Sequence, residues 1–353
     1  MSQQVAPLAV SMGEPAGIGT EILLKAYAAL TEEASGFPVP FFTIDDPARL
    51  AKITRDARAP FRVLTIEHPK DAAEAFKDGL PVLPLGDEAI AGLESVTLSQ
   101  PSPSSAKAVI SSIESAVSAS LNGSASGVVT LPIQKSVLSE AGFAFPGHTE
   151  FLGALTESTA MLDGRARGPV MMLAGPTLRT VPVTVHVPLK QVPEALTTEA
   201  IVHTATVTAQ SLIADFGVAE PKIAISGLNP HAGENGMLGA EDRDIILPAI
   251  KILREQGIRA AGPFPADTMF HEEARSQYHA ALAMYHDQAL VPVKTLHFHD
   301  AVNVTLGLPI IRTSPDHGTG LPIAGKGVAR PDSTIAAIRL AANMAVARAR
   351  HGA

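Results

Sequence analysis

The sequence predicts an α/β fold with a largely parallel sheet, and two observations support this prediction. Short apolar runs typical of buried strands alternate along the chain with segments whose apolar residues recur with helical spacing. Polar residues cluster where several of these runs end. Because ligands in open α/β sheets bind beyond the carboxyl ends of the strands, these clusters are the expected place for chemistry. The length of 353 residues favours two lobes over one.

Composition excludes several classes of function. The chain contains no Cys, which rules out disulfides, thiolate-bound metals, iron–sulfur clusters and thiol nucleophiles. A formal charge of −8 and few aromatic residues argue against a nucleic-acid partner. No apolar run reaches the length of a membrane span, and the first residues lack the basic region of a signal peptide. We therefore expect a cytoplasmic protein that binds neither nucleic acid nor membrane.

The first expected strand, 8–12, runs into a glycine-rich turn at 13–19 and then a helix that begins near Glu21. Strand, glycine turn and helix form the usual context of an anion or nucleotide site, although the spacing is not that of the G-x-G-x-x-G dinucleotide fingerprint. A tight structural turn and a ligand-lining loop both remain open. A helix is expected at 109–121, and further strands are expected at 39–44, 61–66, 80–85 and 127–131.

The polar loop 146–152 carries His148 and Thr149 to the start of a predicted helix, where free N–H groups suit an anion. The alternative is that Thr149 caps the helix and His148 lies at the surface. Helices are expected at 201–212, 242–253 and 333–350, and strands at 180–187, 222–228, 280–284, 302–306 and 310–311.

Three histidines, His186, His231 and His286, each lie at or just past the carboxyl end of a predicted strand. Parallel strands bring such ends to one edge of a sheet, and three neutral imidazoles with an open position form a catalytic zinc arrangement. Polar strand ends without a metal are the alternative. The histidines without this placement are expected at the surface: His271, His279, His297 and His299.

Two cations, Lys294 and Arg312, fall near predicted strand ends. An acidic protein must concentrate positive charge locally to hold an anionic substrate, so both are candidate ligands. Surface salt bridges are the alternative. The segment 320–326 approaches a phosphate-binding loop, but Gly327 replaces the Ser or Thr that would hold magnesium, which argues against a kinase or ATPase.

Five blocks together resemble the 4-hydroxythreonine-4-phosphate dehydrogenase family of pyridoxal 5'-phosphate (vitamin B6) biosynthesis: MGEPAGIG, GHTEFL, LNPHAGE, YHDQ and TLGLPIIRTSPDHGT. They cover nearly the whole chain in the right order. The resemblance implies an isopropylmalate-dehydrogenase-like fold, in which two α/β lobes flank a cleft and bind NAD or NADP without the usual fingerprint. Lobe 1 would hold about 1–145 with 305–353, and lobe 2 about 146–304. It also implies a homodimer with the active site at the dimer interface.

The resemblance assigns roles to individual residues. One divalent metal (zinc, magnesium or cobalt) would be held by His186, His231 and His286, with His286 reaching the site from the partner subunit. Lys294 and Asp267 are the candidates for proton transfer, and Asp267 would lie beside the metal. The substrate contacts would be His148, Thr149, Lys294, Asn303 and Arg312.

The implied reaction is the NAD-dependent, metal-assisted oxidation of 4-phosphooxy-L-threonine to 2-amino-3-oxo-4-phosphooxybutanoate, which decarboxylates to 3-amino-2-oxopropyl phosphate. Glu14, Thr20, Asn235 and Gly320 depart from the commoner family residues. They leave room for a sister dehydrogenase of another phosphorylated hydroxy acid, such as threonate or erythronate 4-phosphate. A metal-dependent hydrolase and a catalytically silent binding protein are the alternatives from other classes.

Overall fold

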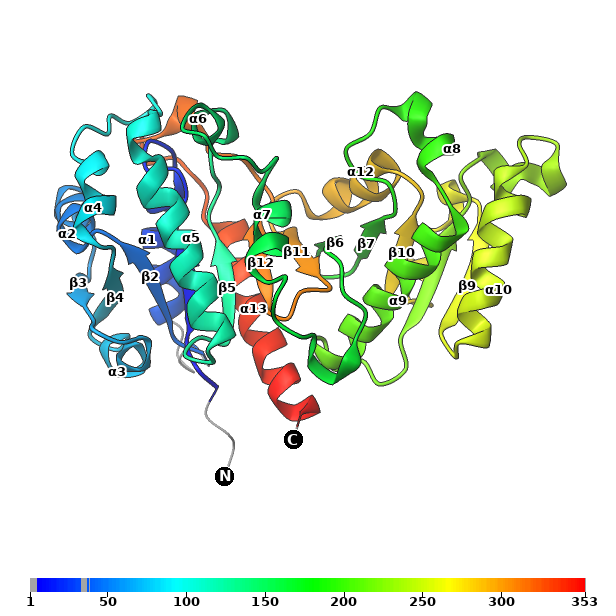
Figure 1. Cartoon of the computed structure of the whole chain (residues 1–353), viewed down its shortest axis with the longest axis horizontal. Helices are drawn as coiled ribbons and strands as arrows, with labels where there is room; N and C mark the ends of the chain where they lie inside the picture. The colour runs from blue at the N-terminus through cyan, green and yellow to red at the C-terminus, as the bar shows by residue number, and fades with distance from the viewer. Residues whose placement is uncertain (1–4, 33–36, 38, 353) are drawn as a thin grey trace. The chain divides into compact units, whose positions relative to one another are not determined.

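The computed structural model describes residues 5–32, 37 and 39–352. They form two compact α/β units: unit 1 comprises Met1–Ala160 with Pro309–Ala349, and unit 2 comprises Met161–Leu308 with Arg350–Ala353 (Figure 1). Residues 146–160, which the sequence places in the second lobe, cluster with unit 1. Local packing favours this assignment, because the Phe151 ring contacts Phe143 edge to face and Phe145 at a tilt, at ring-centroid distances of 4.9 and 5.1 Å.

Unit 1 is built on parallel strands in the order β3-β4-β2-β1-β5-β12. Leu8 of β1 lies opposite Phe41 of β2 on one side and Gly127 of β5 on the other. Successive strands are thus added first on one side of β1 and later on the other, which makes the carboxyl ends of β1 and β5 a topological switch point. The strands are β1 Leu8–Ser11, β2 Phe41–Asp45, β3 Arg62–Thr65, β4 Gly79–Pro84, β5 Gly127–Thr130 and β12 Arg312–Pro315.

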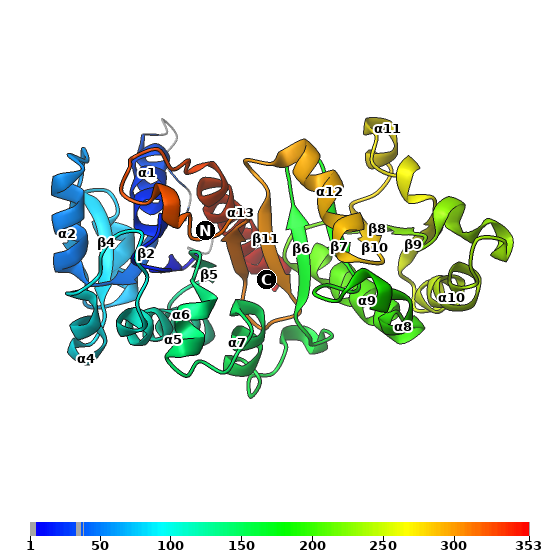
Figure 2. The ribbon, with the colours of Figure 1, turned by 90° about the horizontal axis from the view of Figure 1, so that it is seen from above.

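Helices cover both faces of this sheet. Helix α5 (Ala106–Leu121) lies on one face, and α1 (Gly19–Thr31) and α13 (Asp332–His351) lie on the other (Figure 2). The apolar stripe expected within 109–121 is confirmed, since Val109, Ile113 and Val117 are buried. The remaining helices are α2 Pro47–Asp56, α3 Ala72–Ala75, α4 Asp87–Ile90, α6 Lys135–Glu140 and α7 His148–Leu155, with 3-10 turns η1 Pro69–Asp71, η2 Ala91–Leu93, η3 Pro103–Ser105 and η9 Leu321–Ile323.

Unit 2 has a mixed sheet in the order β11-β6-β7-β10-β8-β9. Strand β6 pairs antiparallel with both β11 and β7, whereas β7, β10, β8 and β9 pair in parallel. The predicted α/β class with a largely parallel sheet is therefore confirmed. The strands are β6 Val170–Ala174, β7 Arg179–Pro182, β8 Lys222–Ser226, β9 Arg259–Phe264, β10 Ala280–Ala283 and β11 Val302–Leu306.

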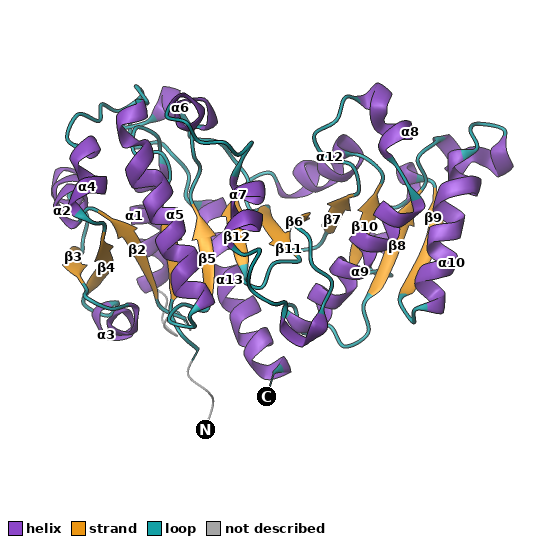
Figure 3. Cartoon of the chain, viewed as in Figure 1, coloured by secondary structure: helices purple, strands orange, loops and turns teal. Residues whose placement is uncertain are grey.

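Strands of unit 2 are also flanked by helices, as the secondary-structure colours of Figure 3 show. Helices α9 (Thr198–Ala214) and α10 (Leu247–Glu255) lie on one face and α12 (His286–His297) on the other (Figure 2). Shorter elements are α8 Val192–Ala195, α11 Glu272–Arg275, η4 Leu162–Gly164, η5 Leu189–Gln191, η6 Pro230–Gly236, the π-turn η7 Asp242–Ile246 and η8 Ala266–Thr268. No helix in the described ranges has the length and apolar character needed to span a bilayer.

Some predicted element boundaries are wrong. The strand expected at 180–187 ends at Pro182, and Thr184 then bonds through its Oγ1 to the Met284 carbonyl at 2.8 Å instead of continuing a regular strand. The strand expected at 310–311 begins only at Arg312. Lys294 lies within helix α12, so it is not a strand-end residue. Asn303 lies within β11.

Candidate functional site

Unit 1 places a buried cation at the carboxyl end of β5. Arg312, the first residue of β12, is only 4% exposed. Its Nε and Nη2 donate to Thr130 Oγ1, the last residue of β5, at 3.1 and 2.7 Å. Burial lowers the pKa of Arg312 to about 10, so its guanidinium is still charged at neutral pH. The fold therefore keeps a positive charge fixed at this sheet edge.

His148 begins helix α7, and its ring lies close to this cation. The Nε2 atom is shielded from solvent and has no hydrogen-bond partner among the described residues. Burial, and then the charges of Arg312 and Lys135, hold the pKa of His148 well below its usual value, so the ring is neutral. The N-cap of α7 is Gly147, so Thr149 is the second helical residue and the interpretation of Thr149 as a simple cap is wrong.

The glycine-rich turn after β1 packs tightly against other loops of unit 1. Gly13 has φ +66°, and a Cβ there would lie 2.8 Å from the Pro132 carbonyl oxygen. A Cβ on Gly17 would lie 2.6 Å from the carbonyl oxygen of Thr319, and Ile18 N donates to that same oxygen at 2.9 Å. These glycines are required by packing, which supports the structural interpretation of the turn.

In unit 2, two of the three candidate metal ligands lie together. The ring centroids of His186 and His286 are 5.9 Å apart. His286 begins α12, and its Nδ1 lies 2.7 Å from Asp287 Oδ1. If Nδ1 carries the proton, this contact leaves Nε2 with a free lone pair, as in metal-binding histidines that a carboxylate orients.

His231 lies in the left-handed turn of η6. Five consecutive residues, from His231 to Asn235, have φ between +43° and +75°. Non-glycine residues rarely adopt this conformation, and Gly233 is the only glycine of the five. The chain leading into the turn is anchored by buried Asp242, which accepts hydrogen bonds from the backbone N–H groups of Leu228 and Asn229 at 2.9 and 3.2 Å. Local backbone strain of this kind is typical of functional loops.

The three candidate metal ligands do not form a complete metal site within the described residues of a single chain. Across the described ranges, no group of three or more His, Asp or Glu side chains is arranged to hold a metal ion. Of the three candidate histidines, a ring contact is seen among the described residues only between His186 and His286. Asp267 lies in η8, the turn that follows β9.

Two of the histidines expected at the surface have structural contacts. His297 Nε2 lies 2.8 Å from Thr177 Oγ1, and the ring packs over Gly175. His279 Nδ1 accepts a hydrogen bond from the Lys222 backbone N–H at 2.9 Å. Both side chains are half-buried and still lie at the surface, where each contacts a neighbouring segment of unit 2.

Gln288 is a site residue that the sequence arguments above did not single out. Its Oε1 accepts from Ser226 Oγ and the Met284 backbone N–H at 2.8 and 2.7 Å, and its Nε2 donates to the Gly227 carbonyl at 2.8 Å. The side chain thus fixes the first turn of α12, which carries His286, to the ends of β8 and β10. Its sequence signals are its position two residues after His286 at a predicted strand end and its place in the block YHDQ.

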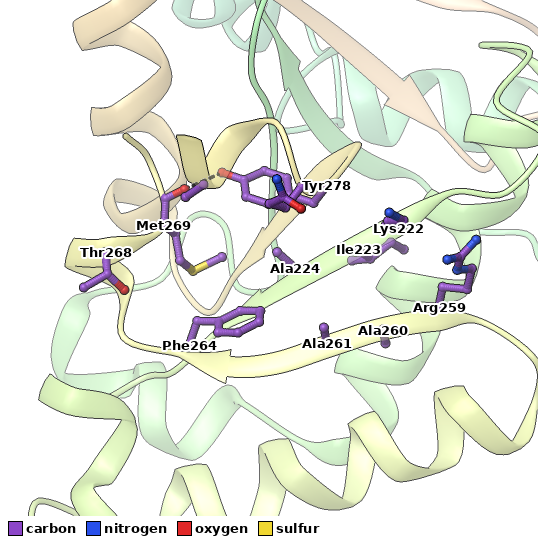
Figure 4. A pocket seen from close by; sticks show the side chains of 12 residues that line it. Lys222, Ile223, Ala224, Arg259, Ala260, Ala261, Phe264, Thr268, Met269 and Tyr278 are labelled. Atoms are coloured by element: carbon purple, nitrogen blue, oxygen red, sulfur yellow. Dashed lines mark hydrogen bonds between the residues drawn. The ribbon is translucent and has the colours of Figure 1, made fainter. Parts of the chain in front are cut away.

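A pocket of about 420 Å³ opens over β8 and β9 in unit 2 (Figure 4). Most of its lining is apolar, with Phe264 and Met269 near Thr268, and with Lys222 and Arg259 towards the other side of the pocket. The loop that carries Asp267 therefore forms part of its wall. A phosphorylated hydroxy acid needs many polar partners, so this lining does not suit such a substrate.

Comparison with known proteins places this architecture among the dehydrogenases. The crystal structure of 4-hydroxythreonine-4-phosphate dehydrogenase from Klebsiella pneumoniae is similar with a TM-score of 0.84 and 34% identity, covering 98% of this chain and 99% of that one. The chain is thus an oxidoreductase with an isopropylmalate-dehydrogenase-like fold.

Sequence relatives give the family. The family model described as pyridoxal phosphate biosynthetic protein PdxA matches residues 39–341 of the chain. The 4-hydroxythreonine-4-phosphate dehydrogenase of Caulobacter vibrioides is 54% identical over 342 residues, which is 97% of this chain and 98% of that protein. The enzyme of the same name from Methylorubrum extorquens is 50% identical over 348 residues, 98% and 96% of the two chains. The chain belongs to the PdxA family.

Proposed function

We propose that the protein oxidises 4-phosphooxy-L-threonine with NAD or NADP and releases CO₂, as a 4-hydroxythreonine-4-phosphate dehydrogenase of pyridoxal 5'-phosphate biosynthesis. The observation that carries the proposal is that relatives of this name match nearly the whole chain at about half identity. The neutral His148 and the charged Arg312 support it, because together they suit a phosphate group, with Thr149 beside them at the start of α7.

A divalent metal fits the donor set of unit 2. His186 and His286 would hold it, since their ring centroids are 5.9 Å apart and Asp287 contacts Nδ1 of His286, which leaves Nε2 for the metal. His231 would complete the set. When bound, such a metal acts as a Lewis acid towards a substrate oxygen. Zinc, magnesium and cobalt all remain candidates.

The chemistry left to the chain is binding and proton transfer. Oxidation moves a hydride from C3 of the substrate to the nicotinamide and a proton from the C3 hydroxyl to a base, for which Lys294 and Asp267 are the candidates. Asn303 and Lys294 would contact the polar groups of the substrate. For the dinucleotide, unit 1 offers the glycine-rich segment after β12, where the Cβ positions of Gly318 and Gly327 face open space.

A homodimer accounts for the exposed apolar residues of α12 and its C-cap. Val291 and Phe298 are 61% and 72% exposed. They lie on one side of the helix together with Lys294, whereas Leu290 and Val293 are buried. A partner subunit that covers this side would bring Lys294 to the dimer interface. Because His186 and His286 pair within one chain, we propose that His231, and not His286 as the family resemblance implies, comes from the partner.

The basic experiment measures metal content and nicotinamide reduction with 4-phosphooxy-L-threonine, threonate 4-phosphate and erythronate 4-phosphate. We expect the first to be the best substrate, and His186→Ala and His286→Ala to lose both metal and turnover while staying folded. Faster oxidation of one of the other acids would favour a sister dehydrogenase. Phosphate release without any nicotinamide cofactor would favour a hydrolase.

Subunit mixing tests which ligand is shared. Inactive His231→Ala mixed with inactive His286→Ala, or with inactive His186→Ala, should recover about a quarter of wild-type activity, because half of randomly paired dimers contain one intact site of two. Inactive His186→Ala mixed with inactive His286→Ala should recover nothing, since every site keeps a defect. Recovery in that last mixture would show that His186 and His286 come from different chains. Exchange of labelled subunits must be shown in each case.

A further inference from the structure

Positive charges converge at the start of α7, where Lys135 forms no ion pair with the described residues. Lys135 is the first residue of α6, and its side chain reaches across to the next helix. A Cβ built on Gly147, the N-cap of α7, would lie 3.2 Å from both Cε and Nζ of Lys135. The same position lies 3.4 Å from Glu150 Oε2, so one carboxylate of the first turn of α7 is also close by. Arg312 and Lys135 both act electrostatically on the ring of His148. In the part of the chain that the structure describes, Lys135 Nζ has no hydrogen bond and no ion pair.

This arrangement does not serve the stability of the free protein. A lysine in the first turn of a helix faces the positive end of the helix dipole, so its position at the start of α6 is unfavourable. The same ammonium lies beside the positive end of α7 and within reach of the field of Arg312. The neutral ring of His148 adds no negative charge, and among the described residues the nearby Glu150 carboxylate forms no ion pair with Lys135. An anion placed between Lys135, Arg312 and the start of α7 reduces the repulsion among them and gains from each of these three.

We infer that Lys135 is a further ligand of the anionic end of the substrate, and that with Arg312 and the start of α7 it selects for a phosphate group. The inference rests on the proposed function, because that function supplies a substrate with a phosphate. Lys135 would act as a mobile point charge, since its side chain is exposed, whereas Arg312 is fixed by Thr130. The two cations would bind different oxygens of the same phosphate.

The test compares Lys135→Met, Lys135→Gln and Lys135→Arg with the wild type and with Lys52→Met, a control at another exposed lysine of unit 1. Inorganic phosphate is titrated calorimetrically at constant ionic strength, and steady-state kinetics are measured with 4-phosphooxy-L-threonine. We expect the Met and Gln variants to raise the Kd for phosphate and the KM for substrate about tenfold, with kcat and the KM for NAD nearly unchanged. The Arg variant and Lys52→Met should stay close to wild type.

The outcomes separate the two proposals. Unchanged phosphate affinity and unchanged KM in folded Lys135→Met and Lys135→Gln overturn the role of Lys135, even if the enzyme oxidises the expected substrate. Weaker phosphate binding in both variants, in a protein that does not oxidise that substrate, supports the anion site and overturns the proposed function. A raised KM for NAD alone would place Lys135 at the cofactor and also overturn the inference.

Discussion

At the scale of single residues, the electrostatics of unit 1 centre on His148. Its ring is kept neutral by burial and by two neighbouring cations, and its Nε2 is shielded without a hydrogen-bond partner among the described residues. A neutral imidazole can donate one hydrogen bond to a phosphate oxygen without adding a third charge to the cluster. The free protein shields this nitrogen from water and places two cations near the ring, so protonation of His148 opposes folding.

The stability of the protein should therefore depend on His148 below about pH 6.5, the ordinary pKa of histidine. The unfolded chain takes up a proton there while the folded chain resists it, so the free energy of unfolding falls as the pH drops, by about 1.4 kcal/mol per unit for one group. Above that pH the contribution is fully present. Urea unfolding of wild type and His148→Asn at pH 5.5 and 7.5 would measure the difference.

We expect His148→Asn to lose less stability on acidification than the wild type. Glu14 and Asp45, whose pKa values burial raises, act in the opposite direction and are common to both proteins. An identical pH dependence of the two proteins would show that His148 is freely protonated in the fold.

At the scale of elements, two segments of unit 2 fix the candidate metal ligands. The left-handed turn of η6 carries His231, and the first turn of α12 carries His286. Neither conformation is favoured by local sequence alone. The first is imposed through Asp242 and the second through Gln288. The contributions of Asp242 and Gln288 to the free energy of unfolding can be measured separately, because no hydrogen bond among the described residues joins these two side chains.

Asn235 tests the strain of the left-handed turn. It is exposed and has φ +56°, a conformation that Asn tolerates better than Ala and that Gly adopts freely. We expect Asn235→Ala to lower the free energy of unfolding by about 1 kcal/mol and Asn235→Gly not to lower it. Asn343→Ala, at an exposed position of α13, is the control and should be neutral or slightly stabilising. Equal effects of Ala and Gly at 235 would contradict the assigned backbone conformation.

Gln288 tests the anchoring of α12. Its replacement by Ala leaves the Met284 N–H, the Gly227 carbonyl and Ser226 Oγ without their partner, which should cost about 2 kcal/mol or more in the free energy of unfolding. Metal retention during dialysis against a chelator should also fall, because His286 loses its support. Gln256→Ala, at the exposed end of α10, serves as the control. Normal metal retention in folded Gln288→Ala would show that Gln288 is not needed to position His286 for metal binding.

The sequence predicts the elements better than the site, for identifiable reasons. Strands β8, β10 and β11 follow from apolar runs at those positions. The sequence places Arg312 just beyond a strand, whereas Arg312 is the first residue of β12. This strand has no apolar run that would reveal it. Most of its buried residues are polar, and Arg312 and Thr313 satisfy their side chains by hydrogen bonds within the fold. Lys135 and Arg312 are far apart in sequence, and only the folded chain lets both cations act on His148. The left-handed turn has one glycine among five residues, so no pattern indicates it.

At the scale of the whole molecule, the exposed apolar residues of α12 and its C-cap form the surface at which the proposed homodimer can be tested by mutation. We expect Val291→Asp or Phe298→Asp to shift the protein from dimer to monomer in sedimentation velocity and to abolish turnover, because each puts a charge on the surface that a partner would cover. Val328→Asp is a matched control in unit 1, where Val328 is 62% exposed. A wild-type monomer with full activity would refute the shared site.

The order of the chain also has a consequence for biosynthesis. Unit 2 is nearly continuous in sequence, whereas unit 1 needs Pro309–Ala349, which contains β12 and most of α13. A ribosome adding about 5 to 20 residues per second completes this last segment seconds after the rest of unit 1 has been made. Until then the β12-facing edge of β5 lacks its strand, and apolar surface that α13 later covers is open to water. Unit 2 can thus finish folding while unit 1 is still incomplete, and a nascent chain stalled before Pro309 presents that bare strand edge to chaperones and to other unfinished chains.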